Sequence, residues 1–114
     1  MLKNLIGALL GALLLPALPA RAAEPLKVGF VYVTPVGQAG WTYQHDLARQ
    51  AMERALGARV ATRVVEAVPE GPDAERVMRD LASQGVGLIF ATSFGYLEPG
   101  LRVAAEFPNV RIEH

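Results

Sequence analysis

The fold class of this chain is decided by the stretch Leu26-Lys27-Val28-Gly29-Phe30-Val31-Tyr32-Val33. The run is nearly continuously apolar and rich in valine and aromatic residues, which is typical of a strand buried on both faces. Strands of this kind belong to parallel sheets that carry helices on both sides. The sequence therefore predicts an α/β fold.

The rest of the chain alternates strand and helix patterns. The expected strands span 26–33, 60–68, 86–91 and 110–113, and the expected helices span 42–56, 72–84 and 97 to the Phe107-Pro108 pair. The order β-α-β-α-β-α-β suits right-handed crossovers onto a parallel sheet. We therefore expect a Rossmann-like open parallel sheet, with 60–68 at an edge and 86–91 in the centre.

Each expected helix carries an apolar stripe that is predicted to face the sheet. The stripes are Leu47, Ala48, Ala51, Met52 and Ala55 in the first helix, Ala74, Val77, Met78 and Leu81 in the second, and Leu97, Leu101, Ala104 and Ala105 in the third. Gly57 and Gly85 are placed to end the first two helices in a left-handed conformation.

Residues 1–22 have the pattern of a secretory signal peptide that is cleaved after Ala22. Lys3 supplies the charge, 5–15 is an apolar core, and Ala20-Arg21-Ala22 provides small residues at the cleavage site. An uncleaved membrane anchor is the rival interpretation, but eleven apolar residues are fewer than the roughly 20 that a spanning helix needs. Residues 23–114 are therefore expected to form the mature part, soluble in a bacterial periplasm.

Composition excludes several classes of function for the mature part. Because Lys3 and Arg21 fall in the leader, nine basic side chains remain against eleven acidic ones, a net charge of −2. The basic residues are spread among acidic ones rather than clustered, so binding to nucleic acid is not expected. The absence of cysteine rules out disulfides, thiolate metal sites and a lipid-anchored cysteine. The two histidines, His45 and His114, lie on distant elements, and no metal or other cofactor is expected.

The candidate site follows the first strand. The loop and helix start at 33–46 hold the only Trp, one of three Tyr and one of two His, and such loops line the ligand crevice of open α/β sheets. Trp41 and Phe94, which follows the strand 86–91, are the candidates for stacking on a flat heteroaromatic ligand. Thr42, Ser93 and Gln44 are candidates for hydrogen bonds to the ligand edge, and Tyr96 is a further candidate contact.

Structural roles compete with these assignments. Trp41 is equally suited to packing the loop against the helix. Asp46 in the first helical turn is explained by the helix dipole, and His45 by a hydrogen-bonded packing role, so both are predicted to be structural. Ser93 with His45 and Asp46 also suggests a secreted α/β hydrolase, but the loop lacks G-x-S-x-G, and adjacent His and Asp on one helix cannot form a relay to Ser. We expect no enzyme activity.

Several motifs together resemble one known family. An exported chain with 27–33, then Pro35-Val36-Gly37, Gly40-Trp41-Thr42-Tyr43-Gln44-His45-Asp46 and Thr92-Ser93-Phe94-Gly95-Tyr96, is similar to the basic membrane protein (BMP), or PnrA-like, family of ABC-transporter substrate-binding proteins. The likeness covers nearly all mature residues. The chain departs from the family in lacking the lipoprotein Cys of many relatives and in having Gln38 where an acidic residue is common.

The resemblance implies a type I periplasmic binding protein, in which two Rossmann-like lobes close on a small ligand and deliver it to a membrane permease. It implies a purine base or nucleoside as the ligand. Residues 23–114 would be the N-terminal portion of the first lobe, which agrees with 111–114 reading as a strand that is broken off. A ligand-sensing receptor domain of the same fold is the alternative, and the residues do not separate the two.

Overall fold

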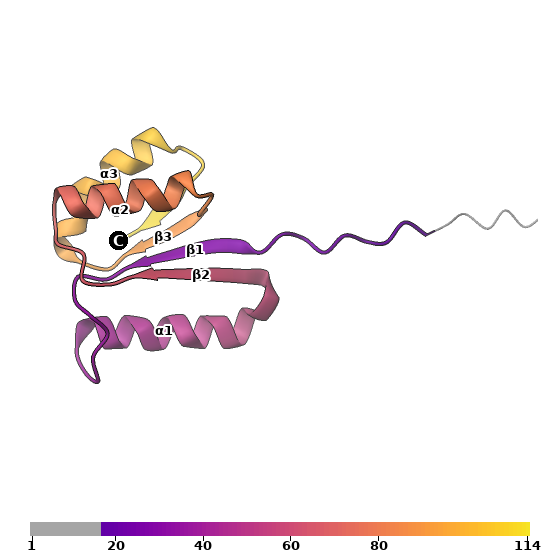
Figure 1. Ribbon diagram of the computed structural model, residues 1–114, viewed down its shortest axis with the longest axis horizontal. Helices are drawn as coiled ribbons and strands as arrows, with labels where there is room; N and C mark the ends of the chain where they lie inside the picture. The colour runs from indigo at the N-terminus through magenta and orange to yellow at the C-terminus, as the bar shows by residue number, and fades with distance from the viewer. Residues whose placement is uncertain (1–16) are drawn as a thin grey trace, which may run out of the picture.

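The computed structural model describes residues 17–114. Its strands and helices are β1 (Leu26–Val31), α1 (Trp41–Leu56), β2 (Val60–Val65), α2 (Pro72–Ser83), β3 (Leu88–Ala91), α3 (Leu97–Glu106) and β4 (Arg111–Glu113). The strands form one parallel sheet in the order β2-β1-β3-β4. Helix α1 covers one face, and α2 and α3 cover the other (Figure 1). The predicted α/β architecture is confirmed, with β2 at an edge and β3 inside the sheet.

The parallel register brings the carboxyl ends of the strands to one edge. Phe30 of β1 lies beside Val64 of β2 on one side and beside Phe90 of β3 on the other. The strands therefore end almost level with one another. The loops that leave β1, β2 and β3 consequently gather at a single edge, which is where ligands bind in this class of sheet.

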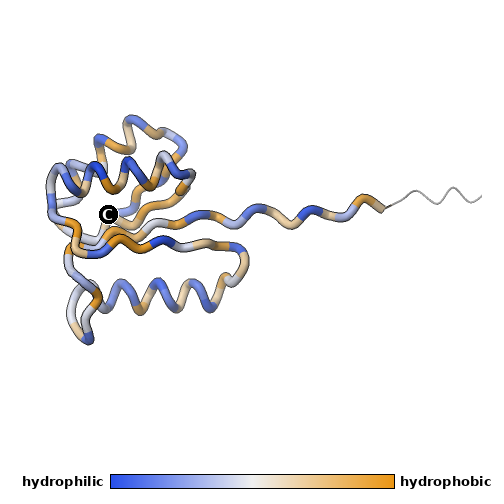
Figure 2. Tube along the Cα trace, viewed as in Figure 1, coloured by the Kyte–Doolittle hydropathy of each residue, from blue (hydrophilic) through white to orange (hydrophobic). Residues whose placement is uncertain are grey.

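Two apolar clusters fill the layers on either side of the sheet. The larger one lies under α2 and α3 and includes Val31, Met78 and Ile89, all of which are fully buried. The smaller one, on the α1 side, contains Phe30, whose ring stacks on Phe90 with centroids 4.9 Å apart. Figure 2 shows hydrophobic residues concentrated along the strands, between the helix layers.

The stripe predicted for α2 is confirmed, and both helix-ending glycines have a positive φ. Ala74, Met78 and Leu81 are buried, with Val77 half-buried. Gly85 follows the helix at φ 85°, and Gly57 follows α1 at φ 51°. Glycine is favoured at both positions because a positive φ is costly for residues with a Cβ.

The face predicted for α1 is wrong at four of its five positions, and only Met52 packs against the sheet as predicted. Leu47 is 38% exposed, and Ala48, Ala51 and Ala55 are exposed as well. The buried residues of the helix are Thr42 and Asp46. The face of α1 against the sheet therefore combines two buried polar residues, Thr42 and Asp46, with Met52.

A hydrogen-bond network explains why Asp46 of α1 faces the sheet. Asp46 accepts hydrogen bonds from the Tyr32 hydroxyl of the loop after β1 (3.2 Å), from Nε of Arg49 (2.7 Å) and from Nε2 of Gln50 (2.9 Å). Tyr32 is fully buried, and a buried hydroxyl without a partner costs free energy. Burial, reinforced by the charge of Asp46, raises the pKa of Tyr32 to about 12. The hydrogen bond from Arg49 holds the pKa of Asp46 below its usual value.

The face predicted for α3 is also wrong. Leu97 and Leu101 are 45% and 56% exposed, whereas Pro99, Gly100 and Val103 are buried. Tyr96, just before the helix, is fully buried, and its hydroxyl donates to the Val68 carbonyl (2.5 Å). Tyr96 therefore sets the rotation of α3, because Gly100 and Val103 follow it four and seven residues later on the same face.

The chain before β1 runs away from the fold without helix or strand from residue 17 to residue 25 (Figure 1). Most of the expected leader, residues 1–16, lies outside the described residues. Among residues 17–114, no helix has the length and apolar character needed to cross a membrane.

The two faces of α1 generate a paired test. Asp46→Ala is expected to lower the free energy of unfolding of the full-length protein by about 2 kcal/mol, because it leaves the buried Tyr32 hydroxyl without its acceptor and removes one of the two carboxylate partners of Arg49. Leu47→Ala is expected to change it by less than about 0.5 kcal/mol. Urea denaturation measures both. If Leu47→Ala cost the 2 kcal/mol or more of a buried leucine, the observed orientation of α1 would be contradicted.

Candidate ligand-binding site

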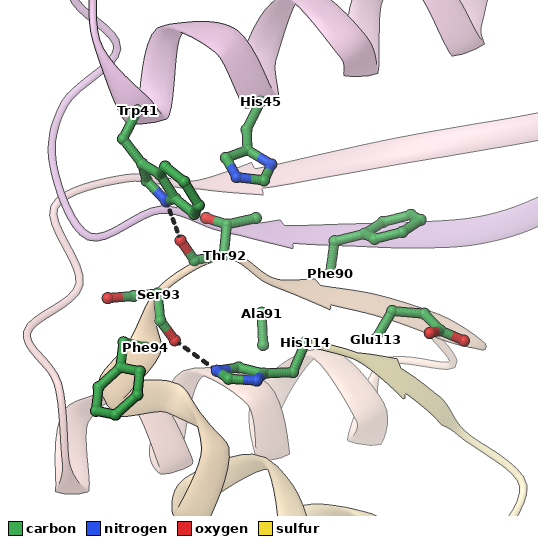
Figure 3. A pocket seen from close by; sticks show the side chains of 9 residues that line it. All are labelled: Trp41, His45, Phe90, Ala91, Thr92, Ser93, Phe94, Glu113 and His114. Atoms are coloured by element: carbon green, nitrogen blue, oxygen red, sulfur yellow. Dashed lines mark hydrogen bonds between the residues drawn. The ribbon is translucent and has the colours of Figure 1, made fainter.

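A pocket lies at the edge where the strands end. Its volume of about 510 Å³ is in the range of small-molecule sites. It is lined by residues of α1, β3, β4 and the segments that follow the two strands: Trp41, His45, Phe90, Ala91, Thr92, Ser93, Phe94, Glu113 and His114. Figure 3 shows Trp41 and His45 reaching from the start of α1 toward the end of β3, with Phe94 and His114 on the opposite side.

Trp41 is held in a fixed orientation although its side chain is 65% exposed. It is the first residue of α1 and follows Gly40, whose φ of 95° turns the chain into the helix. The indole Nε1 donates to the Thr92 carbonyl (2.5 Å). The ring also meets His45 edge to face, with centroids 4.8 Å apart. One hydrogen bond and one ring contact thus orient an aromatic surface that remains open to solvent.

The end of β3 is the point at which the surrounding segments meet. The Thr92 hydroxyl is buried and donates to the Val31 carbonyl of β1 (2.7 Å), while its own carbonyl accepts from Trp41. The Ser93 carbonyl accepts from Nε2 of His114, after β4 (2.8 Å). Two consecutive residues therefore connect β3 to β1, α1 and the end of β4.

Glu70 ties the loop between β2 and α2 to the loop between β3 and α3. Its Oε1 accepts from the Ser93 hydroxyl (2.5 Å) and from the Gly95 amide (2.9 Å). These bonds, the one from Ser93 first, lower the pKa of the Glu70 carboxyl. Phe94 lies between these two donors in the sequence, and its side chain is 91% exposed.

The structure separates the six predicted contact residues into three groups. Trp41, Ser93 and Phe94 come together at the pocket. Gln44 lies on α1 and lines a neighbouring hollow that shares Trp41 and His45 with the pocket. Thr42 and Tyr96 are buried, and their hydroxyls bond to Thr34 (2.7 Å) and to the Val68 carbonyl. Their positions suit a supporting role.

Six of the nine residues that line the pocket were not among the predicted contacts: His45, Phe90, Ala91, Thr92, Glu113 and His114. His45, expected to be structural, lines the pocket beside Trp41, and Glu113 and His114 reach it from the end of β4. The signal for the last two was available, since every strand end in a parallel sheet points to the same edge. Glu70 was missed because it is an exposed residue in a loop with no pattern of its own.

The chemistry of the pocket fits binding. The Ser93 hydroxyl donates to Glu70, and Asp46 is engaged by Arg49 and Tyr32, so Ser93, His45 and Asp46 do not form a nucleophile relay. Among residues 17–114, no group of three or more His, Asp or Glu side chains is placed to hold a metal ion. What the site offers is two exposed aromatic side chains, together with the Ser93 hydroxyl and the imidazoles of His45 and His114 among the lining groups.

Comparison with known proteins identifies relatives of the chain. The family model described as ABC transporter substrate-binding protein PnrA-like matches residues 26–112. The chain is 54% identical over 95 residues to a purine-binding protein of Brucella abortus, covering 83% of this chain and 27% of that protein. It is 37% identical over 91 residues to a putative ABC transporter glucose-binding protein of Haloferax volcanii, covering 80% and 23%. The chain thus spans about a quarter of the length of these relatives.

Solved structures share the fold. A solute-binding protein of an ABC transporter system from Conexibacter woesei superposes with a TM-score of 0.69 at 23% identity, over 76% of this chain and 28% of that one. A corresponding protein from Aeropyrum pernix gives a TM-score of 0.61 at 20% identity, over 77% and 24%. The sheet and its helices therefore share their fold with about a quarter of each of these solved chains.

The contact between Glu70 and Gly95 predicts a titration that NMR can follow. Because the hydrogen bonds from Ser93 and Gly95 lower the folded pKa of Glu70, the stabilisation that its charge adds to the contact is fully present above the ordinary glutamate pKa and is lost as the pH falls through the lowered value. The amide proton of Gly95 is expected to shift with a midpoint below about 4.3. Glu70→Gln removes the titrating group and should abolish this transition. A midpoint at or above the ordinary value would contradict the contact.

Proposed function

The chain belongs to the PnrA-like family of ABC transporter substrate-binding proteins, and from this premise we propose that it binds a purine base or nucleoside and delivers it to a membrane permease. In this proposal, residues 1–22 direct export to the periplasm and are removed there. Residues 23–114 then form the front of the first of two lobes that close on the ligand.

The arrangement of Trp41 and Phe94 carries the ligand proposal. Both side chains stand at one pocket at the carboxyl edge of the sheet, and both are largely exposed. An aromatic face that stacks on a flat ring contributes about 0.5–1.5 kcal/mol beyond the burial of its area. Because the hydrogen bond to Thr92 already orients Trp41, little conformational entropy is lost when the ligand arrives.

Polar groups that line the same pocket supply the means to recognise a base edge. The Ser93 hydroxyl donates to Glu70, and its oxygen keeps lone pairs that accept from a ring N–H or an exocyclic amine. His45 presents an imidazole beside Trp41, which donates from one nitrogen and accepts at the other when neutral. A heteroaromatic ring with donors and acceptors on its rim matches this set.

The relatives support a purine and name one competitor. The purine-binding protein of Brucella abortus shares 54% of the aligned residues, against 37% for the putative glucose-binding protein. Sugars also stack their apolar faces on aromatic rings, so glucose belongs among the test ligands. We attribute binding and release to this site, with no covalent step.

The proposal is tested by calorimetry of the full-length protein with adenine, guanine, hypoxanthine, adenosine, guanosine and glucose. At least one purine is expected to bind. Trp41→Ala is expected to weaken that binding at least about tenfold, because it removes a rigid aromatic contact surface. Leu101→Ala, which truncates an exposed side chain of α3, is the control and should bind as the wild type does.

Two results would contradict the proposal. Binding of glucose with no binding of any purine would overturn the ligand class. Unchanged purine affinity in Trp41→Ala would remove the indole from the site.

A further inference from the structure

The loop between β2 and α2 holds the Phe94 loop from outside the pocket. It is itself anchored, since the Val68 amide donates to the Tyr32 carbonyl (3.0 Å), and Ala67 adopts a φ of 53° where the chain bends after β2. From this anchored loop, the Val68 carbonyl accepts from the Tyr96 hydroxyl and the Glu70 carboxylate accepts from Ser93 and Gly95. Every one of these bonds ends on the residues that surround Phe94.

Phe94 has little else to fix its direction. The side chain is 91% exposed, and none of the aromatic pairs among residues 17–114 includes it. The residue begins a single 3₁₀ turn, Phe94–Tyr96. The direction in which its ring leaves the chain is therefore set by the backbone at 93–95, which Glu70 holds at both ends.

Gly95 makes the close approach of Glu70 sterically feasible. A Cβ at this position would lie 2.2 Å from Cδ and 2.3 Å from Oε2 of Glu70. Any larger residue would displace the carboxylate, and since Glu70 is an exposed, flexible side chain, it would move at little cost to the fold. Gly95→Ala is thus a second way to break the contact, one that leaves the chemistry of Glu70 unchanged.

We propose that Glu70 is a positioning residue of the ligand site, which holds the Ser93 hydroxyl and the Gly95 amide so that the Phe94 ring between them is presented to a flat ligand. The inference rests on the proposed function, because it assigns the ring a stacking role. Glu70 itself touches no ligand. It acts by pre-organising the contact surface, which lowers the cost of ordering that surface when the ligand binds.

Because Glu70 acts as the acceptor of two hydrogen bonds, its glutamine and alanine substitutions are expected to affect the contact differently. Both donors meet the same oxygen, Oε1. The amide oxygen of a glutamine accepts two hydrogen bonds as well, so Glu70→Gln preserves the geometry without the charge. Glu70→Ala removes both acceptors. A positioning role predicts loss in the alanine variant and rescue in the glutamine variant.

The experiment measures the affinity of the full-length protein for the purine that the wild type binds, with urea unfolding recorded for every variant. Glu70→Ala and Gly95→Ala are each expected to weaken binding by about three- to tenfold, the range that a lost stacking contact corresponds to. Glu70→Gln should stay within about twofold of the wild type. Glu106→Ala is the matched control, because Glu106 is also an exposed glutamate that bridges two helices, through Arg79, and it should bind normally.

A double-mutant cycle with Phe94→Ala separates positioning from general stabilisation. If Glu70 acts through the Phe94 ring, Glu70→Ala should have no further effect on affinity once that ring is absent. An undiminished loss in the Phe94→Ala background would overturn the proposal, as would unchanged affinity in both Glu70→Ala and Gly95→Ala. A wild type that binds no purine would instead overturn the proposed function, so the two failures are distinguishable.

Discussion

The hydrogen bonds of Thr92 and Ser93 at the end of β3 are the constraint on which the rest of the site depends. The Thr92 hydroxyl fastens β3 to the Val31 carbonyl of β1, and the Thr92 carbonyl receives the Trp41 indole. The Ser93 hydroxyl donates to Glu70 in the loop between β2 and α2, and the Ser93 carbonyl accepts from His114 after β4. These partners come from four different parts of the chain, and two of them, Trp41 and His114, line the pocket. The pocket is consequently organised around the hydroxyl and carbonyl groups of the two residues that follow a central strand.

The polar interface of α1 has a consequence for that pocket. An apolar face tolerates small rotations of a helix, because dispersion contacts and burial are only weakly directional. Asp46 instead has to meet the Tyr32 hydroxyl, which lies outside the helix, at hydrogen-bond distance, and this directional contact restricts the rotation of the helix. Trp41 stands five residues before Asp46 on the same helix. The network that holds α1 on the sheet therefore also fixes the direction of the indole.

The fold could be predicted from the sequence, because it depends on patterns that many residues repeat. The apolar runs of β1 and β3 and the stripe of α2 follow from burial alone, and Gly57 and Gly85 end their helices as the backbone requires. The faces of α1 and α3 could not be predicted in the same way. Each is set by one long-range hydrogen bond, from Tyr32 to Asp46 in the first case and from Tyr96 to Val68 in the second. These bonds join residues that are 14 and 28 positions apart, so the pattern of apolar residues within one helix does not indicate them. Glu70 escaped prediction for the same reason, whereas Trp41, Ser93 and Phe94 were found because strand ends share an edge.

The exposure of the two aromatic rings supports the interpretation of this surface as one side of a clamp. Trp41 and Phe94 are 65% and 91% exposed, although burying an aromatic side chain of that size is worth a few kcal/mol. Hydrogen bonds at Thr92 hold the Trp41 ring, and those at Ser93 and Gly95 hold the segment that carries Phe94, but neither ring is covered. A surface that served only the folding of this lobe would gain by letting the rings collapse onto the sheet. Rings that are both ordered and uncovered are preorganised for a partner that arrives later, and a flat ligand held against them by a second lobe would complete their burial.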